Sequence, residues 1–311
     1  MKKIDKNGDL NPVNVTLNEL HGLQFEASGF SFLPKYKVQS LLAGRHKSAM
    51  RGRGLDFKEV RAYVAGDDIR NIDWKVTART QKTHTKVFSE ERERPVLLVV
   101  DQSSSMFFGT QQFLKSTISA HLCALGAWRT VEVGDRVGAF VFNDTEYQQI
   151  RPQRSTTAIL QMLKTVEVYN QKLSAEEAPK SKTALLESVF QKIRSSVNHD
   201  YLIIIISDLR GISDKSLHHI FNLKRHNDVM IFHVEDEWEK DLPMTTLSLS
   251  NSEKQVSISN LMKKERDRQS KSFANDKELL TDQFAEYGIP LLTFTTSERA
   301  SAQVRTLLKD H

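Results

Sequence analysis

Short apolar runs alternate with helical patterns through most of the chain. Residues 96–100 and 202–206 are continuous apolar runs rich in β-branched residues, which is typical of strands covered on both faces. Further strands are predicted at 136–142, 229–234 and 290–295. Apolar residues recur at helical spacing at 111–130, 157–166, 184–197, 213–225, 261–287 and 298–308. Strands that alternate with helices of this length predict βαβ units, so we expect an α/β fold with a doubly wound, mostly parallel sheet.

Three parts of the chain differ in pattern. Residues 1–33 show no sustained periodicity, and we predict a loose N-terminal segment there with one short helix at most. Residues 34–94 mix turn signals with a strand at 85–89, and we predict an arm that packs on the core. Residues 95–311 form the predicted α/β domain, with a β-hairpin inserted at 245–259.

Composition narrows the class of protein. The 311 residues are 39% hydrophobic and 27% charged, which excludes a disordered, collagen-like or coiled-coil chain. No apolar stretch approaches the ~18 residues of a membrane helix, and no apolar segment follows the first lysines as in a secretory signal. The one cysteine, Cys123, cannot form an internal disulfide or a cysteine metal cluster. We therefore expect a cytoplasmic protein.

Positive charge is concentrated in the arm. The net charge is +5, and the segment from Lys35 to Arg61 holds eight basic residues against two acidic ones. Such a segment is either a solvated face or a surface for nucleic acid or acidic lipid. The sequence leaves these alternatives open.

Polar side chains follow the two buried strands. Asp101, Ser103 and Ser105 come directly after the first, and Asp208 follows the second. Ligands of doubly wound sheets bind beyond the carboxyl ends of the strands, and carboxylate and hydroxyl oxygens suit Mg²⁺ or Mn²⁺. The alternative is that these residues only cap a helix and a turn.

The spacing Asp101-x-Ser103-x-Ser105 resembles the metal-ion-dependent adhesion site of von Willebrand factor A domains. That resemblance implies a threonine from a later loop and an aspartate after a following strand. Asp208 matches the aspartate by position, and Thr183 is the best candidate for the threonine, with Thr156 and Thr157 as rivals. The glycines that usually precede the threonine are absent here. The predicted metal ligands are Asp101, Ser103, Ser105, Thr183 and Asp208, with Mg²⁺, or Mn²⁺ or Ca²⁺, as the ion.

A second resemblance rests on the arm. The segments Arg51-Gly-Arg-Gly-Leu-Asp-Phe57, Gly66-Asp-Asp-Ile-Arg-Asn-Ile-Asp-Trp74 and Ala78-Arg79 precede the Asp-x-Ser-x-Ser motif, and together they resemble the family called domain of unknown function 58. This resemblance implies a bacterial A-domain-like protein, commonly encoded beside a MoxR-type AAA+ ATPase, that acts as an adaptor or chaperone-like partner. From the residues themselves we expect Arg70 to pair with Asp73 and Trp74 to anchor its loop against the sheet, or alternatively to form a partner surface.

The two classes of enzyme that we considered fit the sequence less well than a binding protein does. A haloacid-dehalogenase-like phosphatase would need an aspartate where Ser103 stands, and a serine hydrolase using His233 would need glycines that are absent around Ser103 and Ser105. No phosphate-binding Gly-x-x-x-x-Gly-Lys-Ser/Thr motif occurs. A metal-dependent hydrolase and a nucleic-acid-binding protein remain alternatives.

The predicted function is a non-enzymatic adaptor. Its metal ion would engage an acidic residue of a partner, a MoxR-type AAA+ ATPase or its client. The acidic loop 235–241 should flank the site and offer Trp238 as an anchor.

Overall fold

The structure, a computed structural model, describes residues 10–31, 55–90, 94–174, 181–240, 248–250, 255–257 and 277–308. The chain divides into two compact units, Met1–Val38 with Arg94–His311 and Gln39–Glu93. We call them the large unit and the small unit.

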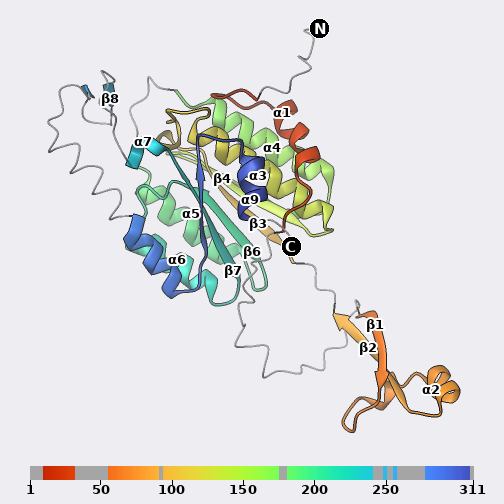
Figure 1. Ribbon diagram of the computed structural model, residues 1–311. Helices are drawn as coiled ribbons and strands as arrows, with labels where there is room; N and C mark the ends of the chain where they lie inside the picture. Colours follow the sequence, from red (N-terminus) through yellow and green to blue (C-terminus); the bar gives the residue numbers. More distant parts are fainter. Residues whose placement is uncertain are drawn as a thin grey trace. The chain divides into compact units, whose positions relative to one another are not determined.

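A six-stranded sheet forms the centre of the large unit, in the order β10-β7-β6-β3-β4-β5 (Figure 1). The strands are β3 Val96–Asp101, β4 Val137–Phe142, β5 Tyr147–Gln153, β6 Leu202–Ser207, β7 Asp228–Glu235 and β10 Leu291–Thr295. Neighbouring strands are parallel except β5, which is antiparallel to β4. The predicted α/β class with a mostly parallel sheet is therefore confirmed.

Helices cover both faces of this sheet. Because successive residues of a strand point to opposite faces, each buried strand contributes side chains to the apolar layer on either side. Leu98 and Val100 belong to one apolar cluster, and Leu97 and Val99 belong to another. The first cluster includes side chains of α1 Leu17–Gly22, α3 Lys115–Glu132, α4 Thr156–Gln171 and α9 Ala300–Leu307. The second includes side chains of α5 Thr183–Ser196, α6 Asp214–Lys224 and the helical residues 277–286.

Residues 10–31 contain the one short helix that we predicted for the N-terminal segment, but this part of the chain packs on the core and is not loose, which corrects that prediction. The other residues of the predicted segment 1–33 lie outside the described residues. Within 10–31, α1 is followed by a 3-10 helix, η1 Leu23–Glu26. Leu20, Leu23, Ala27 and Phe30 are at most 2% exposed and belong to the first apolar cluster. Their spacing of three, four and three residues is helical, a signal too short to count as sustained periodicity.

The small unit contains a two-stranded antiparallel sheet of β1 Leu55–Ala62 and β2 His84–Glu90. Between them lie a 3-10 helix, η2 Ile69–Asn71, and α2 Trp74–Thr80. Asp73 caps α2 by accepting hydrogen bonds from the N–H groups of Lys75 and Val76. Arg70 pairs with Asp68 at 2.9 Å, which corrects the expected Arg70–Asp73 pair.

Trp74 is the first residue of α2 and is 70% exposed. The expected anchoring of its indole against the sheet, which belongs to the large unit, stays a prediction. The predicted packing of residues 34–94 on the core stays a prediction. Most of the basic segment, up to residue 54, lies outside the described residues.

The predicted hairpin at 245–259 is confirmed by the antiparallel strands β8 Ser248–Ser250 and β9 Gln255–Ser257. Residues 261–276 of the predicted helix 261–287 lie outside the described residues, while 277–286 are helical. Among the helices that the structure describes, none has the length and apolar character needed to cross a bilayer.

Candidate functional site

The carboxyl ends of β3 and β6 bring two carboxylates together. These parallel strands are neighbours, with Val100 opposite Ile206. Asp101 is the last residue of β3 and Asp208 is the first residue after β6, so the two lie at the same edge of the sheet. The backbone N–H and the Oγ of Ser103 donate to Asp101 Oδ1 at 2.9 and 2.5 Å. Ser207 Oγ donates to Asp101 Oδ2 at 2.6 Å. The turn after β3 and the end of β6 therefore each supply one hydroxyl to a fully buried aspartate.

The ammonium group of Lys182 stands at the centre of these oxygens. Its Nζ lies 2.7 Å from Asp101 Oδ2 and 3.1 Å from Asp208 Oδ1. It also lies 2.9 Å from Ser103 Oγ and 2.9 Å from Ser105 Oγ. We call the four residues Asp101, Ser103, Ser105 and Asp208 the oxygen cage. Lys182 precedes α5 and its side chain is 4% exposed, so this cation belongs to the interior.

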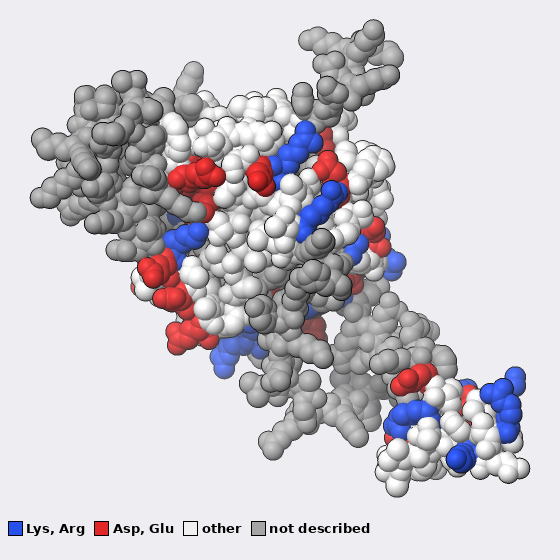
Figure 2. Space-filling view, in the orientation of Figure 1, with Lys and Arg blue, Asp and Glu red and all other residues white. Residues whose placement is uncertain are grey.

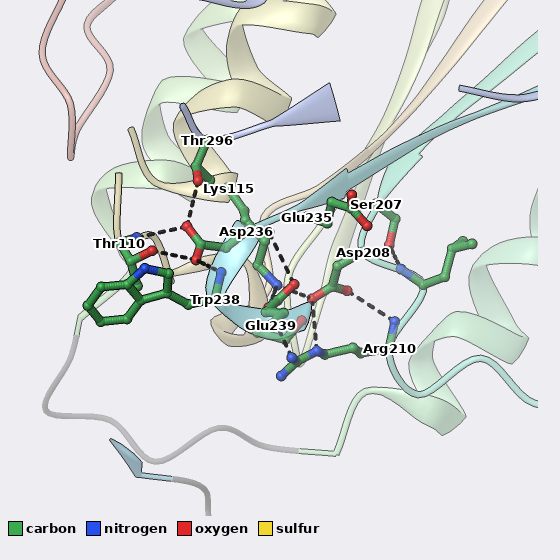
Figure 3. A network of polar contacts seen from close by, with 12 residues as sticks. Thr110, Lys115, Ser207, Asp208, Arg210, Glu235, Asp236, Trp238, Glu239 and Thr296 are labelled. Carbon is green, nitrogen blue, oxygen red and sulfur yellow. Dashed lines mark hydrogen bonds and ion pairs between the residues drawn. The ribbon is translucent and has the colours of Figure 1, made fainter. Parts of the chain in front are cut away.

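A second buried lysine extends the network. Lys115 Nζ, with no exposed side-chain surface, lies 3.0 Å from Asp208 Oδ2 and 2.6 Å from Glu239 Oε1. Arg210 donates to the same Glu239 oxygen at 2.9 Å. Figure 3 shows Glu239 between Lys115 and Arg210, next to Asp208. Three cations and three carboxylates are thus directly paired at this edge.

The pairing sets the protonation states. Burial alone would raise the pKa of Asp208, but Lys115, Lys182 and Arg210 outweigh it and hold that pKa well below its ordinary value. Burial alone would lower the pKa of Lys182, but Asp101 and Asp208 reverse the effect and raise it. At neutral pH the site therefore contains an ammonium ion between carboxylates.

A protonated Lys182 has a chemical consequence for Ser103 and Ser105. A lysine that activates a serine must accept a proton, so it needs a lowered pKa. The pKa of Lys182 is raised instead. In the part of the chain described, neither serine side chain bonds a histidine. The arrangement therefore lacks the base of a serine hydrolase.

The acidic loop after β7 does flank the site, as expected. It contains a short helix, α7 Glu237–Lys240, whose Glu239 contacts Lys115. Asp236 is fully buried and accepts hydrogen bonds from Thr110 Oγ1 at 2.6 Å and Thr296 Oγ1 at 2.5 Å. These bonds join loops from three parts of the chain (Figure 3). Asp144, after β4, holds the turn after β3 by accepting from the N–H of Ser104 at 2.8 Å.

Four of the five predicted metal ligands are brought together, and Thr183 is not among them. Thr183 is the first residue of α5, and within the described residues its hydroxyl makes no hydrogen bond to the cage. The rivals Thr156 and Thr157 are exposed in the first turn of α4. The signal that sequence reasoning missed is Lys182 itself, which occupies a position where the adhesion-site resemblance leads one to expect glycine.

The cage oxygens are of the right kind for Mg²⁺, but their present arrangement does not fit the ion. These oxygens lie 2.7–3.1 Å from Lys182 Nζ, and such distances are hydrogen-bond lengths. Mg²⁺ requires oxygens at about 2.0–2.1 Å, and Lys182 Nζ stands where the ion would sit. Metal binding by Asp101, Ser103, Ser105, Thr183 and Asp208 stays a prediction from the sequence.

A pocket of about 430 Å³ lies elsewhere, at the amino ends of β3, β4 and β6. Arg136, Arg151 and Lys192 line it, together with Pro95, Gln149, Pro152, Ser196 and Tyr201. No carboxylate or imidazole is among these lining residues, and the charged side chains among them are all basic. We take the carboxyl edge, with its buried ionic network, as the candidate functional site.

Solved structures with a distant similarity to this chain include the BatB protein from Bacteroides thetaiotaomicron (13% identity, 68% of this chain and 96% of that one, TM-score 0.42). Others are an aerotolerance-related membrane protein from Bacteroides fragilis (10% identity, 69% and 96%, TM-score 0.39) and the SpRpn10 VWA domain (12% identity, 69% and 95%, TM-score 0.36).

Relatives by sequence include uncharacterized proteins of Mycobacterium bovis and Mycobacterium tuberculosis, each 29% identical over 177 residues, or 57% of this chain. The chain spans about half the length of these relatives, 54%. The model of one family matches residues 59–278, which include the turn after β3, Lys182 and Asp208. The chain therefore belongs to the family described as "Protein of unknown function DUF58".

Proposed function

We propose that the chain is a non-enzymatic protein-interaction module whose partner is a MoxR-type AAA+ ATPase. The observation that carries the proposal is the surface of the small unit. Val64, Ile69 and Trp74 are 60%, 67% and 70% exposed within eleven residues of sequence. Exposed large apolar side chains are typical of interaction surfaces where they form a patch, and tryptophan is among the residues that contribute most to binding energy at interfaces.

The charges beside these side chains are already compensated. Arg61 pairs with Asp67 at 2.7 Å, and Arg70 pairs with Asp68 at 2.9 Å. An approaching partner would therefore meet an apolar group flanked by paired ions, the pattern of an interface centre with a polar rim. On the face of the large unit shown in Figure 2, acidic and basic side chains of the described residues are interspersed. In the described part of the small unit the Arg61–Asp67 and Arg70–Asp68 pairs leave no field of one sign beside Trp74, which supports a protein partner more than a nucleic acid.

The family resemblance suggests the identity of the partner, and the sequence supports a division of labour. The chain has no phosphate-binding loop of its own. An ATPase partner would supply nucleotide hydrolysis, while this chain would supply a rigid α/β unit and an exposed binding surface. The sequence also predicts a metal-bridged form of this interaction, in which an acidic residue of the partner completes the shell of an ion at the cage.

Binding to a purified MoxR-type ATPase, measured by interferometry, tests the proposal. Trp74→Ala should weaken binding at least tenfold, about 1.4 kcal/mol, and leave the melting temperature unchanged. Phe25→Ala is a matched control, because Phe25 is an aromatic residue 80% exposed on the large unit. It should change neither quantity.

Three outcomes would change the picture. Unchanged binding by Trp74→Ala would reject the surface. Lost binding together with a lower melting temperature would return Trp74 to the docking role expected from the sequence. Wild-type binding that disappears when EDTA is added would favour the metal-bridged form.

A further inference from the structure

We propose that the Lys182 ammonium group replaces the divalent cation in the oxygen cage, so that the chain carries its own cation there and binds no metal ion. The inference concerns the cage alone. It holds whether or not the partner is an ATPase, and its test uses no partner.

The first argument is the saturation of the cage. The three N–H donors of an ammonium group face four acceptor oxygens, from Asp101, Ser103, Ser105 and Asp208, all within 3.1 Å. Asp101 has no oxygen to spare, since Ser103 uses Oδ1, and Ser207 and Lys182 use Oδ2. An ion could enter only by displacing Lys182.

The second argument is charge. Asp101, Asp208 and Glu239 are matched by Lys115, Lys182 and Arg210. Further carboxylates lie at this edge outside these pairs, among them Asp144, which Ser104 holds, and Asp236, which Thr110 and Thr296 hold. Neither of these two sets of bonds involves the cage. A divalent ion beside Lys182 would place two cations among the same four oxygens, and their mutual repulsion in the interior is costly. The pairing is that of a site with its cation already in place.

The third argument is the close packing around the lysine stem. Gly211, in the turn after β6, has φ +73°, a left-handed conformation that favours glycine. A Cβ at this position would lie 3.5 Å from Lys182 Cγ, an ordinary van der Waals contact, and 3.3 Å from Thr183 Oγ1, a tighter one. The turn after β6 therefore lies directly against the stem of Lys182, at the strand end that also carries Asp208.

Mn²⁺ titration followed by electron paramagnetic resonance tests the inference. The wild-type chain should show no saturable Mn²⁺ site at millimolar concentrations. Lys182→Ala should gain one site, bound at least tenfold more tightly than any wild-type binding, and Lys182→Ala with Asp101→Ala should lose it. Lys172→Ala also removes one positive charge, but from an exposed pair with Glu146, and should gain no site.

Two results would overturn the inference. One is a wild-type chain that binds one Mn²⁺ as tightly as Lys182→Ala does. The other is a folded Lys182→Ala variant that binds none, because the oxygens would then not form a cation site.

A second measurement needs only the wild-type chain, and it decides the question if Lys182→Ala fails to fold. Reductive methylation read by mass spectrometry should leave Lys182 unmodified while exposed lysines react. Ten millimolar MgCl₂ should not change this. A metal-induced rise in labelling at Lys182 would show that the ion displaces the lysine, and would also overturn the inference.

Discussion

Buried charge at the carboxyl edge is compensated by individual side chains. Lys115 is completely buried and Lys182 nearly so, and each lies within 3.1 Å of a carboxylate oxygen. Desolvation of an ion costs several kcal/mol, and a partner at hydrogen-bond distance offsets that cost. Asp208 is shared by both lysines, so it is the residue whose loss would leave the most charge without compensation.

We therefore expect Asp208→Ala to destabilise the large unit by about 3–5 kcal/mol, since it leaves two buried ammonium groups without this partner. Urea denaturation monitored by circular dichroism measures the free energy of unfolding. Asp214→Ala is the control, because Asp214 is an exposed aspartate in the first turn of α6, and its loss should cost less than about 0.5 kcal/mol. Equal effects of the two substitutions would contradict the network.

The strands that the sequence predicts most clearly are those whose residues are apolar along the whole strand. β3 and β6 are buried along their whole length, so their apolar runs identify them. β5 was missed because only Ile150 is buried on this antiparallel edge strand, and its other residues read as a polar loop. β1 was missed because Lys58, Glu59 and Arg61 interrupt its apolar residues.

The candidate site was predictable only in part, for a related reason. The rule that ligands lie beyond strand ends selects Asp101 and Asp208, because strand order fixes where backbones end. The same rule says nothing about Lys182 or Lys115, whose long side chains reach the edge from helix termini. Which cation occupies a set of oxygens depends on those rotamers, and a sequence pattern does not contain them.

The N-terminal segment depends on two side chains of α4. Glu167 Oε1 accepts the backbone N–H of Leu17 at 3.0 Å, and Asn170 Oδ1 accepts that of Val15 at 2.9 Å. Burial alone would raise the pKa of Glu167, but Lys164 and the N–H of Leu17 outweigh it and lower that pKa. A carboxyl whose pKa is lower in the folded than in the unfolded state stabilises the fold above its unfolded value, and this contribution disappears on acidification.

We expect wild type to exceed Glu167→Gln by about 1 kcal/mol in unfolding free energy at pH 7. This difference should begin to shrink as the pH falls below the unfolded glutamate value of about 4.3 and disappear below the folded pKa. Urea titrations at several pH values measure it. Glu132→Gln, at the half-exposed end of α3, is the control. A difference that stays constant down to pH 3 would contradict the proposed role of the Glu167 carboxylate.

The two units differ in how much apolar surface each buries. In residues 59–86 of the small unit, Thr85 alone is buried, at 3% exposure. The large unit contains two apolar clusters, one on each face of its sheet. A two-stranded sheet without such a cluster is of marginal stability. The small unit should therefore open without global unfolding.

Hydrogen exchange followed by mass spectrometry tests this difference. Amides of β1 and β2 should exchange at least about 100-fold faster than those of β3 and β6, because local opening exposes them at a lower free energy than global unfolding. A saturating MoxR-type ATPase should slow exchange in residues 59–86 and leave β3 and β6 unchanged, since a ligand stabilises the element that it covers. Equal protection of all four strands in the free chain would show that the small unit is not independently unstable. Slower exchange confined to the carboxyl edge of the sheet would instead move the partner surface from Trp74 to the region around Trp238.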